Sequence, residues 1–163
     1  MQYDQNPFSP EDKERHEIWE KVVKRDIDAF LAEDWTLCQE DFVDTYFMGI
    51  DAQKHDNPDS WRLTYPSLEA YKNDWLRQAK VFADASYAED KREALFRATT
   101  LTDIEIRGDA ALLHKKFDGT IRKTDGEYVP ILWQTLYTMQ KIEGVWKITG
   151  FVGYMPNPMG AIS

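Results

Sequence analysis

The sequence predicts an α+β domain in which three N-terminal helices pack on a curved, mainly antiparallel sheet that forms a cone with an internal cavity. Two patterns carry this expectation. Apolar residues recur at three- and four-residue steps in the first half of the chain, as in amphipathic helices, and they alternate from Lys91 onward, as in strands. Because the helices are short relative to such strands, we expect them to leave one end of the sheet open above a cavity. The 163 residues suit a single domain.

Helical signals open the chain. The segment FSPEDKE predicts a helix start, because Ser9 can cap it and Pro10 suits the first helical turn. An apolar face follows at helical spacing, formed by Trp19, Val22, Val23, Ile27, Phe30 and Leu31. A short second helix is predicted over residues 35–42, followed by a strand over VDTYFMGI (43–50). A third helix is predicted over residues 67–85.

The second half of the chain predicts two hairpins. ALFRATTLTDIEIRGDAALLHKKF (94–117) has the pattern of two strands that turn at Gly108-Asp109, a pair suited to the positive φ angles of a tight turn. The segment DGTIRKTDGEY (118–128) is expected to be a loop. Two more strands follow, with their turn at Glu143-Gly144.

Composition limits the classes of partner. With 29 acidic and 20 basic residues, the chain has a formal charge of −9. This charge opposes the phosphate attraction that dominates nucleic-acid binding, so we expect no nucleic-acid partner and no docking on anionic membranes. The uncharged apolar run 128–140 is shorter than the ~20 residues of a membrane-spanning helix, and the first residues lack the apolar stretch of a signal peptide. We expect a cytoplasmic protein in which the lone Cys38 is a small buried hydrophobic residue.

Three strings and the order of elements resemble a known superfamily. They are DIDAFLAEDWTLCQEDFVDTYF, YPSLEAYKNDW and LYTMQKIEGVWKITGF. Together they resemble the nuclear transport factor 2-like superfamily, in particular its SnoaL-like and ketosteroid-isomerase-like branch. The resemblance covers residues 10–155 as one domain, with tails at 1–9 and 156–163. It implies a cone-shaped α+β fold, homodimers paired through the sheet, and a pocket that serves either an enzyme or a pure binding protein.

The resemblance directs attention to the end of the first strand. In isomerase and cyclase members the general base is an acid at this position, and here the strand ends MGIDAQ. Asp51 is the nearest match, but alanine follows it where proline is common, and an offset of one residue would place Ile50 at the catalytic point. In an apolar pocket, desolvation would raise the pKa of Asp51 and suit it to proton transfer; at a solvated strand end it would not. His55, four residues later, is the candidate acid/base partner or a solvated loop histidine.

Large side chains before the third helix are candidates for the rim of the cone. Trp61 and Tyr65 are aromatic residues that we expect to lean over the opening. Arg62, between them, would hold a carboxylate or enolate oxygen of a substrate, or else pair with Asp59 or Asp56 and order the loop.

The register of the first predicted hairpin places an acidic residue opposite a histidine. With Gly108 and Asp109 as the turn, Asp103 faces His114 across the hairpin. A carboxylate in that position would fix the histidine tautomer, as in catalytic pairs. The more apolar Ile104 lies on the opposite face, so this pair is expected either to face outward or, if the cavity is on its side, to make His114 a catalytic base.

The last hairpin predicts an aromatic inner face. Trp133, Thr135, Tyr137, Met139, Trp146, Ile148, Val152 and Tyr154 share it. Trp133 and Tyr154 lie farthest from the turn, so we expect them to line the pocket. The opposite face carries Gln134, Leu136, Thr138, Thr149 and Phe151, which is apolar enough to predict a homodimer through the sheet.

Two functional hypotheses remain open. The first is a cofactor-free enzyme of the isomerase, dehydratase or cyclase type that transfers protons in an apolar pocket, with Asp51, His55 or His114 as base. The second is a binding module for a small apolar or amphipathic molecule, or a subunit-pairing module, of the same fold. We expect no metal, because the histidines are scattered and no paired ligand spacing occurs.

Overall fold

The structure, a computed structural model, describes residues 2–157; Met1 and residues 158–163, which fall in the predicted tails, lie outside the described residues. The helices are α1 (Lys13–Trp19), α2 (Asp26–Leu31), α3 (Leu68–Asp84) and α4 (Lys91–Ala98). The strands are β1 (Met48–Asp51), β2 (Arg62–Tyr65), β3 (Thr99–Arg107), β4 (Ala110–Arg122), β5 (Tyr128–Ile142) and β6 (Val145–Met155). Short 3₁₀ turns lie at Trp35–Leu37, Gln39–Asp41 and Pro58–Ser60.

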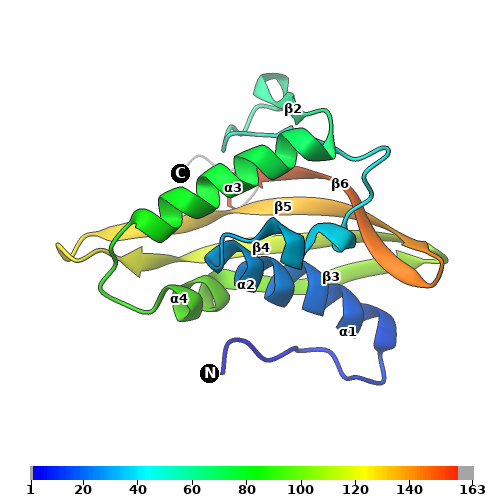
Figure 1. Cartoon of the computed structure of the whole chain (residues 1–163), viewed down its shortest axis with the longest axis horizontal. Coiled ribbons are helices and arrows are strands. Elements are labelled where there is room, and N and C mark those ends of the chain that lie inside the picture. The colour runs from blue at the N-terminus through cyan, green and yellow to red at the C-terminus, as the bar shows by residue number, and fades with distance from the viewer. Residues whose placement is uncertain (1, 158–163) are drawn as a thin grey trace.

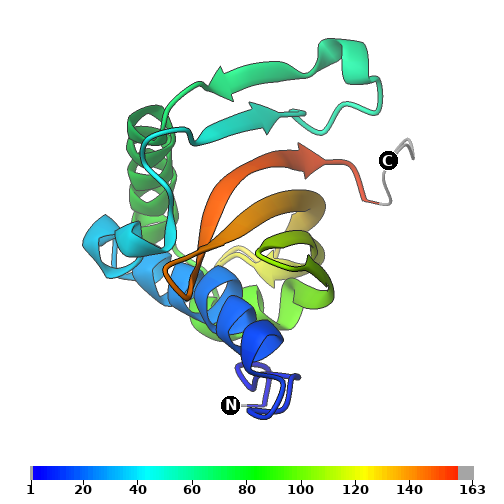
Figure 2. The same cartoon turned by 90° about the vertical axis from the view of Figure 1, so that its right-hand side faces the viewer.

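The six strands form one curved sheet in the order β2-β1-β6-β5-β4-β3. Neighbouring strands are antiparallel except for β1 and β6, which are parallel. The helices lie over one face of the sheet, with α3 crossing β5 and β6 (Figure 1), and the strands curl around that side (Figure 2). This arrangement confirms the predicted α+β class, with helices packed on a mainly antiparallel sheet that is open at one end.

The first helix begins later than predicted and contains an irregular turn. The side chain of Asp12 accepts a hydrogen bond from the Arg15 backbone N–H at 3.5 Å, so Asp12, and not Ser9, caps α1. Between α1 and α2 the chain forms a π-helical turn over Glu20–Arg25, which inserts one extra residue into the helix. On α1, Glu17 accepts from the backbone N–H of Trp146 at 2.9 Å and so ties the helix to β6.

Three segments differ from the predicted pattern. Residues 91–98 form α4 where a strand was expected, because the Asp90 side chain caps the helix by accepting a hydrogen bond from the Glu93 backbone N–H at 2.8 Å. The short strand β2 follows the loop after β1 and pairs with it, with Asp51 opposite Arg62. The predicted second helix is replaced by the 3₁₀ turns at Trp35–Leu37 and Gln39–Asp41.

The two hairpins have the predicted turns and most of the predicted register. Arg107 pairs with Ala110 and Asp103 with His114 across the first turn, and Ile142 pairs with Val145 across the second. The expected loop 118–128 is shorter than predicted, because β4 continues to Arg122 and β5 begins at Tyr128. The positive φ angles of Glu143 and Gly144 match a tight hairpin turn.

An irregularity in β6 changes which of its residues face the helices. The register shifts between the pairs Thr138–Gly150 and Met139–Ile148, so Phe151, which is 6% exposed, lies in the core and Val152 does not. The predicted inner and outer positions of these two residues are therefore exchanged, because a bulge adds one residue and reverses side-chain alternation beyond it.

Aromatic side chains fill the space between the helices and β6. Phe151 packs against Tyr71 of α3 with ring centroids 5.0 Å apart, and Trp35 packs against Trp75 at 5.2 Å. Cys38 is buried beside this cluster, as predicted, at 2% exposure. Edge-on aromatic contacts of this kind add to the apolar burial that holds α3 on the sheet.

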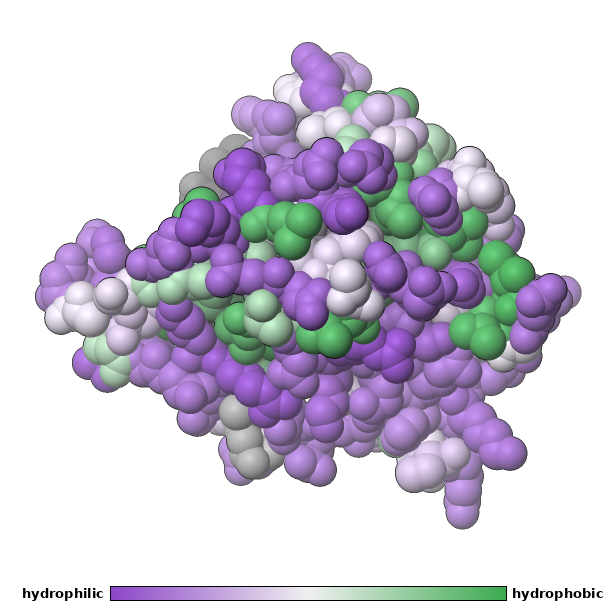
Figure 3. Space-filling view, viewed as in Figure 1, coloured by the Kyte–Doolittle hydropathy of each residue, from purple (hydrophilic) through white to green (hydrophobic). Residues whose placement is uncertain are grey.

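The outer face of the sheet keeps the apolar character that predicts a homodimer. Leu112 and Met48 are exposed on it, and Ile50, Leu136 and Val152 are partly exposed. By contrast, the molecular surface on the side of the helices is mostly hydrophilic with separate hydrophobic patches (Figure 3).

We expect Leu112→Glu to convert a dimer into a monomer, because paired sheets would bury this leucine (46% exposed) and a buried carboxylate is costly. Sedimentation across a dilution series measures the effect. Leu37→Glu, which changes a similarly exposed leucine (52%) outside the sheet, should leave the mass unchanged. A wild-type protein that is monomeric at every concentration would contradict the dimer.

Candidate functional site

A cavity of about 360 Å³ lies between the helices and the inner face of the sheet. Most of its wall is apolar and aromatic, from Phe30, Trp75, Phe82, Phe117, Trp133 and Phe151. Its polar groups come from α2, α3, the central strands and the segment after α3: Asp26, Tyr71, Arg77, Gln78, Tyr87, Lys115, Thr135, Tyr137 and Tyr154. The volume lies in the range of small-molecule pockets, and a few polar groups in an apolar wall are typical of such sites.

A buried ion pair forms part of this wall. The Nζ atom of Lys115 donates to the backbone oxygen of Val22 at 2.7 Å and to Oδ2 of Asp26 at 3.3 Å. The Lys115 side chain is 1% exposed, whereas that of Asp26 is 28% exposed. The ammonium also lies 5.0 Å from the ring centre of Phe117 and 5.9 Å from that of Tyr137. The pair is therefore fixed between two rings that line the cavity.

The sequence positions of Asp26 and Lys115 explain how they meet. Asp26 is the first residue of α2, four residues after Val22 and one before Ile27, so it falls on the apolar face of the helix. Lys115 lies two residues from the buried Phe117 on β4 and therefore faces the same side of the sheet. The indole N–H of Trp75 adds a hydrogen bond to Oδ1 of Asp26 at 3.4 Å.

Neither residue belongs to the predicted site, although a signal was present. An acid on the apolar face of a helix and a lysine at an inward position of a strand each interrupt an apolar pattern. Charged residues are rarely buried unless they are paired, so two such interruptions of opposite sign predict a partner for each other.

Four tyrosines line the cavity: Tyr71, Tyr87, Tyr137 and Tyr154. Burial raises the pKa of Tyr71, Tyr137 and Tyr154 above the ordinary value of a phenol. They therefore remain protonated hydrogen-bond donors at neutral pH. The amide of Gln78 hydrogen-bonds to the Tyr154 hydroxyl and also donates to Asp74 at 2.7 Å.

Tyr154 has an unusual backbone conformation. Its φ is 58°, and the sheet register is irregular beside it, between the pairs Gln134–Met155 and Leu136–Val152. Its backbone oxygen accepts from the Lys54 N–H at 2.6 Å, and Lys54 itself has a φ of 60°. A bulky residue in the left-handed region is strained, and such strain persists only where surrounding contacts hold it. The bulge directs the Tyr154 side chain toward the cavity.

Of the predicted ligand-binding residues, Trp133 and Tyr154 are brought together. Both line the cavity, and their ring centres are 6.1 Å apart. Trp133 also stacks on Phe117 at 4.6 Å, and the Lys54 ammonium lies 5.3 Å from its ring centre.

The other three predicted ligand-binding residues do not line the cavity. Trp61 donates its indole N–H to the His55 backbone oxygen at 2.9 Å, and the exposed Arg62 donates to the backbone oxygen of Asp59 at 3.1 Å. Tyr65 is buried and donates its hydroxyl to Asp74 at 2.6 Å. Because Gln78 also contacts Asp74, Tyr65 is linked to the cavity indirectly.

The predicted catalytic residues Asp51 and His55 also lie outside the cavity lining. Asp51 ends β1, and its Oδ1 accepts from the Gln53 backbone N–H at 2.7 Å. Burial raises the pKa of Asp51, against the lowering effect of that hydrogen bond. His55 is exposed in the following loop.

His114 faces the outer side of the sheet. Its Nε2 lies 2.5 Å from Oε1 of Gln134, whose amide donates to the Pro156 backbone oxygen at 2.6 Å. Asp103 is opposite His114 in register, as predicted, but its carboxylate pairs with Lys116 at 3.0 Å. The structure thus places Asp51, His55 and His114 outside the cavity lining.

Neither a metal cluster nor a membrane-crossing helix is found in residues 2–157. That part of the chain contains no group of three or more histidine, cysteine, aspartate or glutamate side chains arranged to hold a metal ion. Its helices are too short or too polar to cross a membrane.

The fold and its cavity define a class of protein: an α+β cone whose helices and sheet enclose space for a small molecule. The sequence matches no family model and no curated protein. Solved structures do match. One is an NTF2-like protein of unknown function from Shewanella baltica, with a TM-score of 0.54 and 16% identity, covering 90% of this chain and 96% of that one.

Two further matches have the same fold. An NTF2-like protein of unknown function from Pseudomonas putida has a TM-score of 0.55 and 15% identity, over 85% of this chain and 84% of that one. An NTF2-like superfamily protein from Salmonella enterica has a TM-score of 0.53 and 16% identity, over 86% and 89%. The chain has the nuclear transport factor 2-like fold, as the resemblance predicts; membership of the superfamily and of its SnoaL-like branch stays a prediction.

We expect Asp26→Leu to lower the free energy of unfolding by about 3 kcal/mol, because it leaves the Lys115 charge buried without its partner. Adding Lys115→Met should restore most of the loss, since no buried charge then remains. Urea unfolding of both variants measures this. A double variant as unstable as Asp26→Leu alone would show that the pair is not the cause.

Proposed function

We propose that this protein binds a small, uncharged, mainly apolar molecule that carries one polar group. The observation that carries the proposal is the composition of the cavity wall: aromatic over most of its area, with a closed ion pair and tyrosine hydroxyls. An apolar body would fit against the rings, and the polar group would meet the hydroxyls.

The ion pair favours an uncharged ligand over a charged one. Lys115 is already neutralised by Asp26 at 3.3 Å, and Arg77, which also lines the cavity, is neutralised by Asp74 at 2.6 Å, so neither cation of the wall is left without a counter-charge. A carboxylate would meet Asp26 and an amine would meet Lys115, and either would lose its hydration on entry. The protonated hydroxyls of Tyr137 and Tyr154 instead favour a hydrogen-bond acceptor such as a carbonyl or a hydroxyl oxygen.

The probe N-phenyl-1-naphthylamine tests this preference, because its sulfonated relative 1-anilinonaphthalene-8-sulfonate has a similar aromatic body and a negative charge. We expect the uncharged probe to bind at least tenfold more tightly in fluorescence titrations, a difference of about 1.4 kcal/mol. Equal affinities, or tighter binding of the sulfonate, would contradict the proposal.

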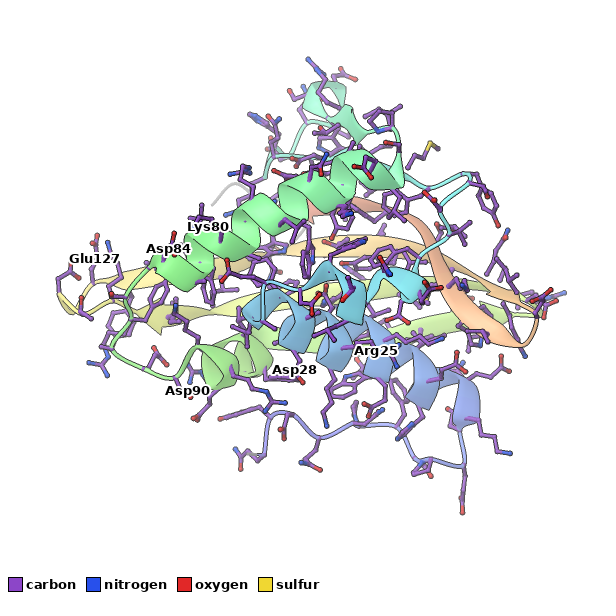
Figure 4. All side chains as sticks on the ribbon, viewed as in Figure 1. Arg25, Asp28, Lys80, Asp84, Asp90 and Glu127 are labelled. Carbon is purple, nitrogen blue, oxygen red and sulfur yellow. The ribbon has the colours of Figure 1, made fainter. Side chains whose placement is uncertain are left out.

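A pair of variants on α3 tests whether binding takes place in the cavity. Val81 lines the cavity and is exposed, so Val81→Trp should fill its entrance and weaken the uncharged probe at least tenfold. Lys80→Trp is the matched control, because Lys80 pairs with Asp84 at 3.1 Å on the outer side of the helix (Figure 4). If both variants bind as the wild type does, the probe site lies elsewhere.

Proton-transfer catalysis, of the isomerase, dehydratase or cyclase kind, is the second candidate. The observation that favours it is the Asp26 carboxylate, which is partly exposed at the cavity wall beside the donors Lys115 and Tyr137. A carboxylate there can accept a proton from a carbon next to a carbonyl, while the donors hold the oxygen.

Exchange of hydrogen for deuterium in an enolisable aromatic ketone, followed by NMR, measures this activity. We expect Asp26→Asn to slow the exchange roughly 10²-fold or more, whereas Asp51→Asn, outside the cavity, should leave it unchanged. Loss of exchange in Asp51→Asn with retention in Asp26→Asn would instead assign the base to the end of β1.

A further inference from the structure

We propose that Lys115 is a reactive amine that condenses with an aldehyde or ketone in the cavity to form an imine, with Asp26 carrying the protons. The proposal rests on the proposed function, because the carbonyl compound must first occupy the cavity. It goes further in two ways. It names the chemical class of the ligand, and it assigns a covalent step to Lys115, which is not one of the predicted site residues.

The position of the amine is the first argument. Lys115 lines the cavity, and its ammonium lies between the rings of Phe117 and Tyr137, which line it too. Its bonds to Val22 and Asp26 use two of the three N–H groups of an ammonium. Both bonds hold Nζ at the apolar wall, where a bound carbonyl carbon would come within reach after a small rotation of the side chain.

The choice of residue is the second argument. A cation that only ties α2 to the sheet would work equally well as an arginine, which cannot be deprotonated in proteins. A lysine can lose a proton, and amines in apolar pockets are the usual source of imines with carbonyl compounds. The ion pair also contributes little to stability, since a buried pair of charges stabilises a fold no more than apolar residues of the same shape would.

The neighbouring groups supply the proton transfers. Asp26 lies 3.3 Å from Nζ and is the exposed member of the pair, so it can take a proton from the ammonium and return it to the ligand oxygen. Thr135 and Tyr137 line the same wall and bring hydroxyls that can hold that oxygen. The site thus combines a nucleophile, a proton carrier and oxygen-binding groups.

The chemical balance is closed without a co-reactant. After Asp26 removes one proton, the nitrogen lone pair attacks the carbonyl carbon, the C–O π electrons move to oxygen, and the oxygen takes a proton to give a carbinolamine. Asp26 then takes a second proton from the nitrogen and passes it to the hydroxyl oxygen, the nitrogen lone pair forms the C=N bond, and the carbon–oxygen bond breaks as the oxygen leaves as water. The sum converts the ammonium and the carbonyl into a protonated imine and water, and the positive charge remains paired with Asp26.

Reductive trapping tests the imine in the wild-type protein. The probe is 6-methoxy-2-naphthaldehyde, an uncharged aromatic aldehyde, with sodium cyanoborohydride to reduce any imine and peptide mass spectrometry to locate it. We expect Lys115 to be labelled at least tenfold faster than Lys80, whose side chain is 70% exposed. N-Phenyl-1-naphthylamine should compete with labelling at Lys115 and not at Lys80.

Two variants separate the roles of the pair. Lys115→Met should lose labelling at this position, while Lys80 is labelled at the wild-type rate and the circular dichroism spectrum stays that of the wild type. Asp26→Asn should slow the labelling of Lys115 at least tenfold with no change at Lys80. Asp84→Asn, which removes a carboxylate that pairs with Lys80 on the outer side of α3, serves as the control, and Lys115 should be labelled in it at close to the wild-type rate.

The outcomes distinguish the imine proposal from the proposed binding function on which it rests. If Lys115 is labelled no faster than Lys80 although N-phenyl-1-naphthylamine binds in the cavity, the imine is refuted and the binding function stands. If the wild type binds no uncharged probe and Lys115 is not labelled, both are refuted. Because the labelling rates are read from the wild-type protein, the result does not depend on whether a variant folds.

Discussion

The contact between Lys115 and Asp26 joins the two layers of the molecule at the point where the cavity begins. Lys115 comes from β4, and the groups that it contacts, the Val22 carbonyl and the Asp26 carboxylate, come from the π-helical turn and the start of α2. Apolar packing alone would draw the helix onto the sheet with no fixed position. A directional contact with two bonds fixes where the helix lies, and the open space beside it remains a cavity rather than a packed core.

Prediction from sequence was most successful where local chemistry determines the conformation. Gly108 in the first turn, and Glu143 and Gly144 in the second, have positive φ angles, so these turns set the hairpin register, and the pairing of Asp103 with His114 follows directly. Beyond the Thr149–Gly150 region of β6 the predicted alternation of inward and outward side chains is wrong, because a bulge adds a residue without a clear sequence signal. Phe151 therefore faces the core against expectation.

The cavity residues illustrate a different limit. Trp133 and Tyr154 were found because strand alternation and distance from the turn place them at the open end, although Tyr154 reaches the cavity only through its strained backbone. Asp26 and Lys115 are not predicted as site residues, because within its own helix or strand each is only a single polar exception to an apolar pattern. Their meaning lies in a contact between residues 89 positions apart, which periodicity does not reveal.

The π-helical turn allows one helix to serve two purposes. Before it, Glu14 and Glu17 on α1 hold the indole and backbone N–H groups of Trp146; after it, Asp26 on α2 faces the cavity. Each residue of an α-helix turns the chain by about 100°, so removing the extra residue would rotate α1 by that amount relative to α2. The inserted residue thus sets the rotation of α1 relative to α2. Residues in either helix can be substituted independently, whereas an insertion or deletion in the turn between them would turn either the Trp146 contacts or Asp26 away from their partners.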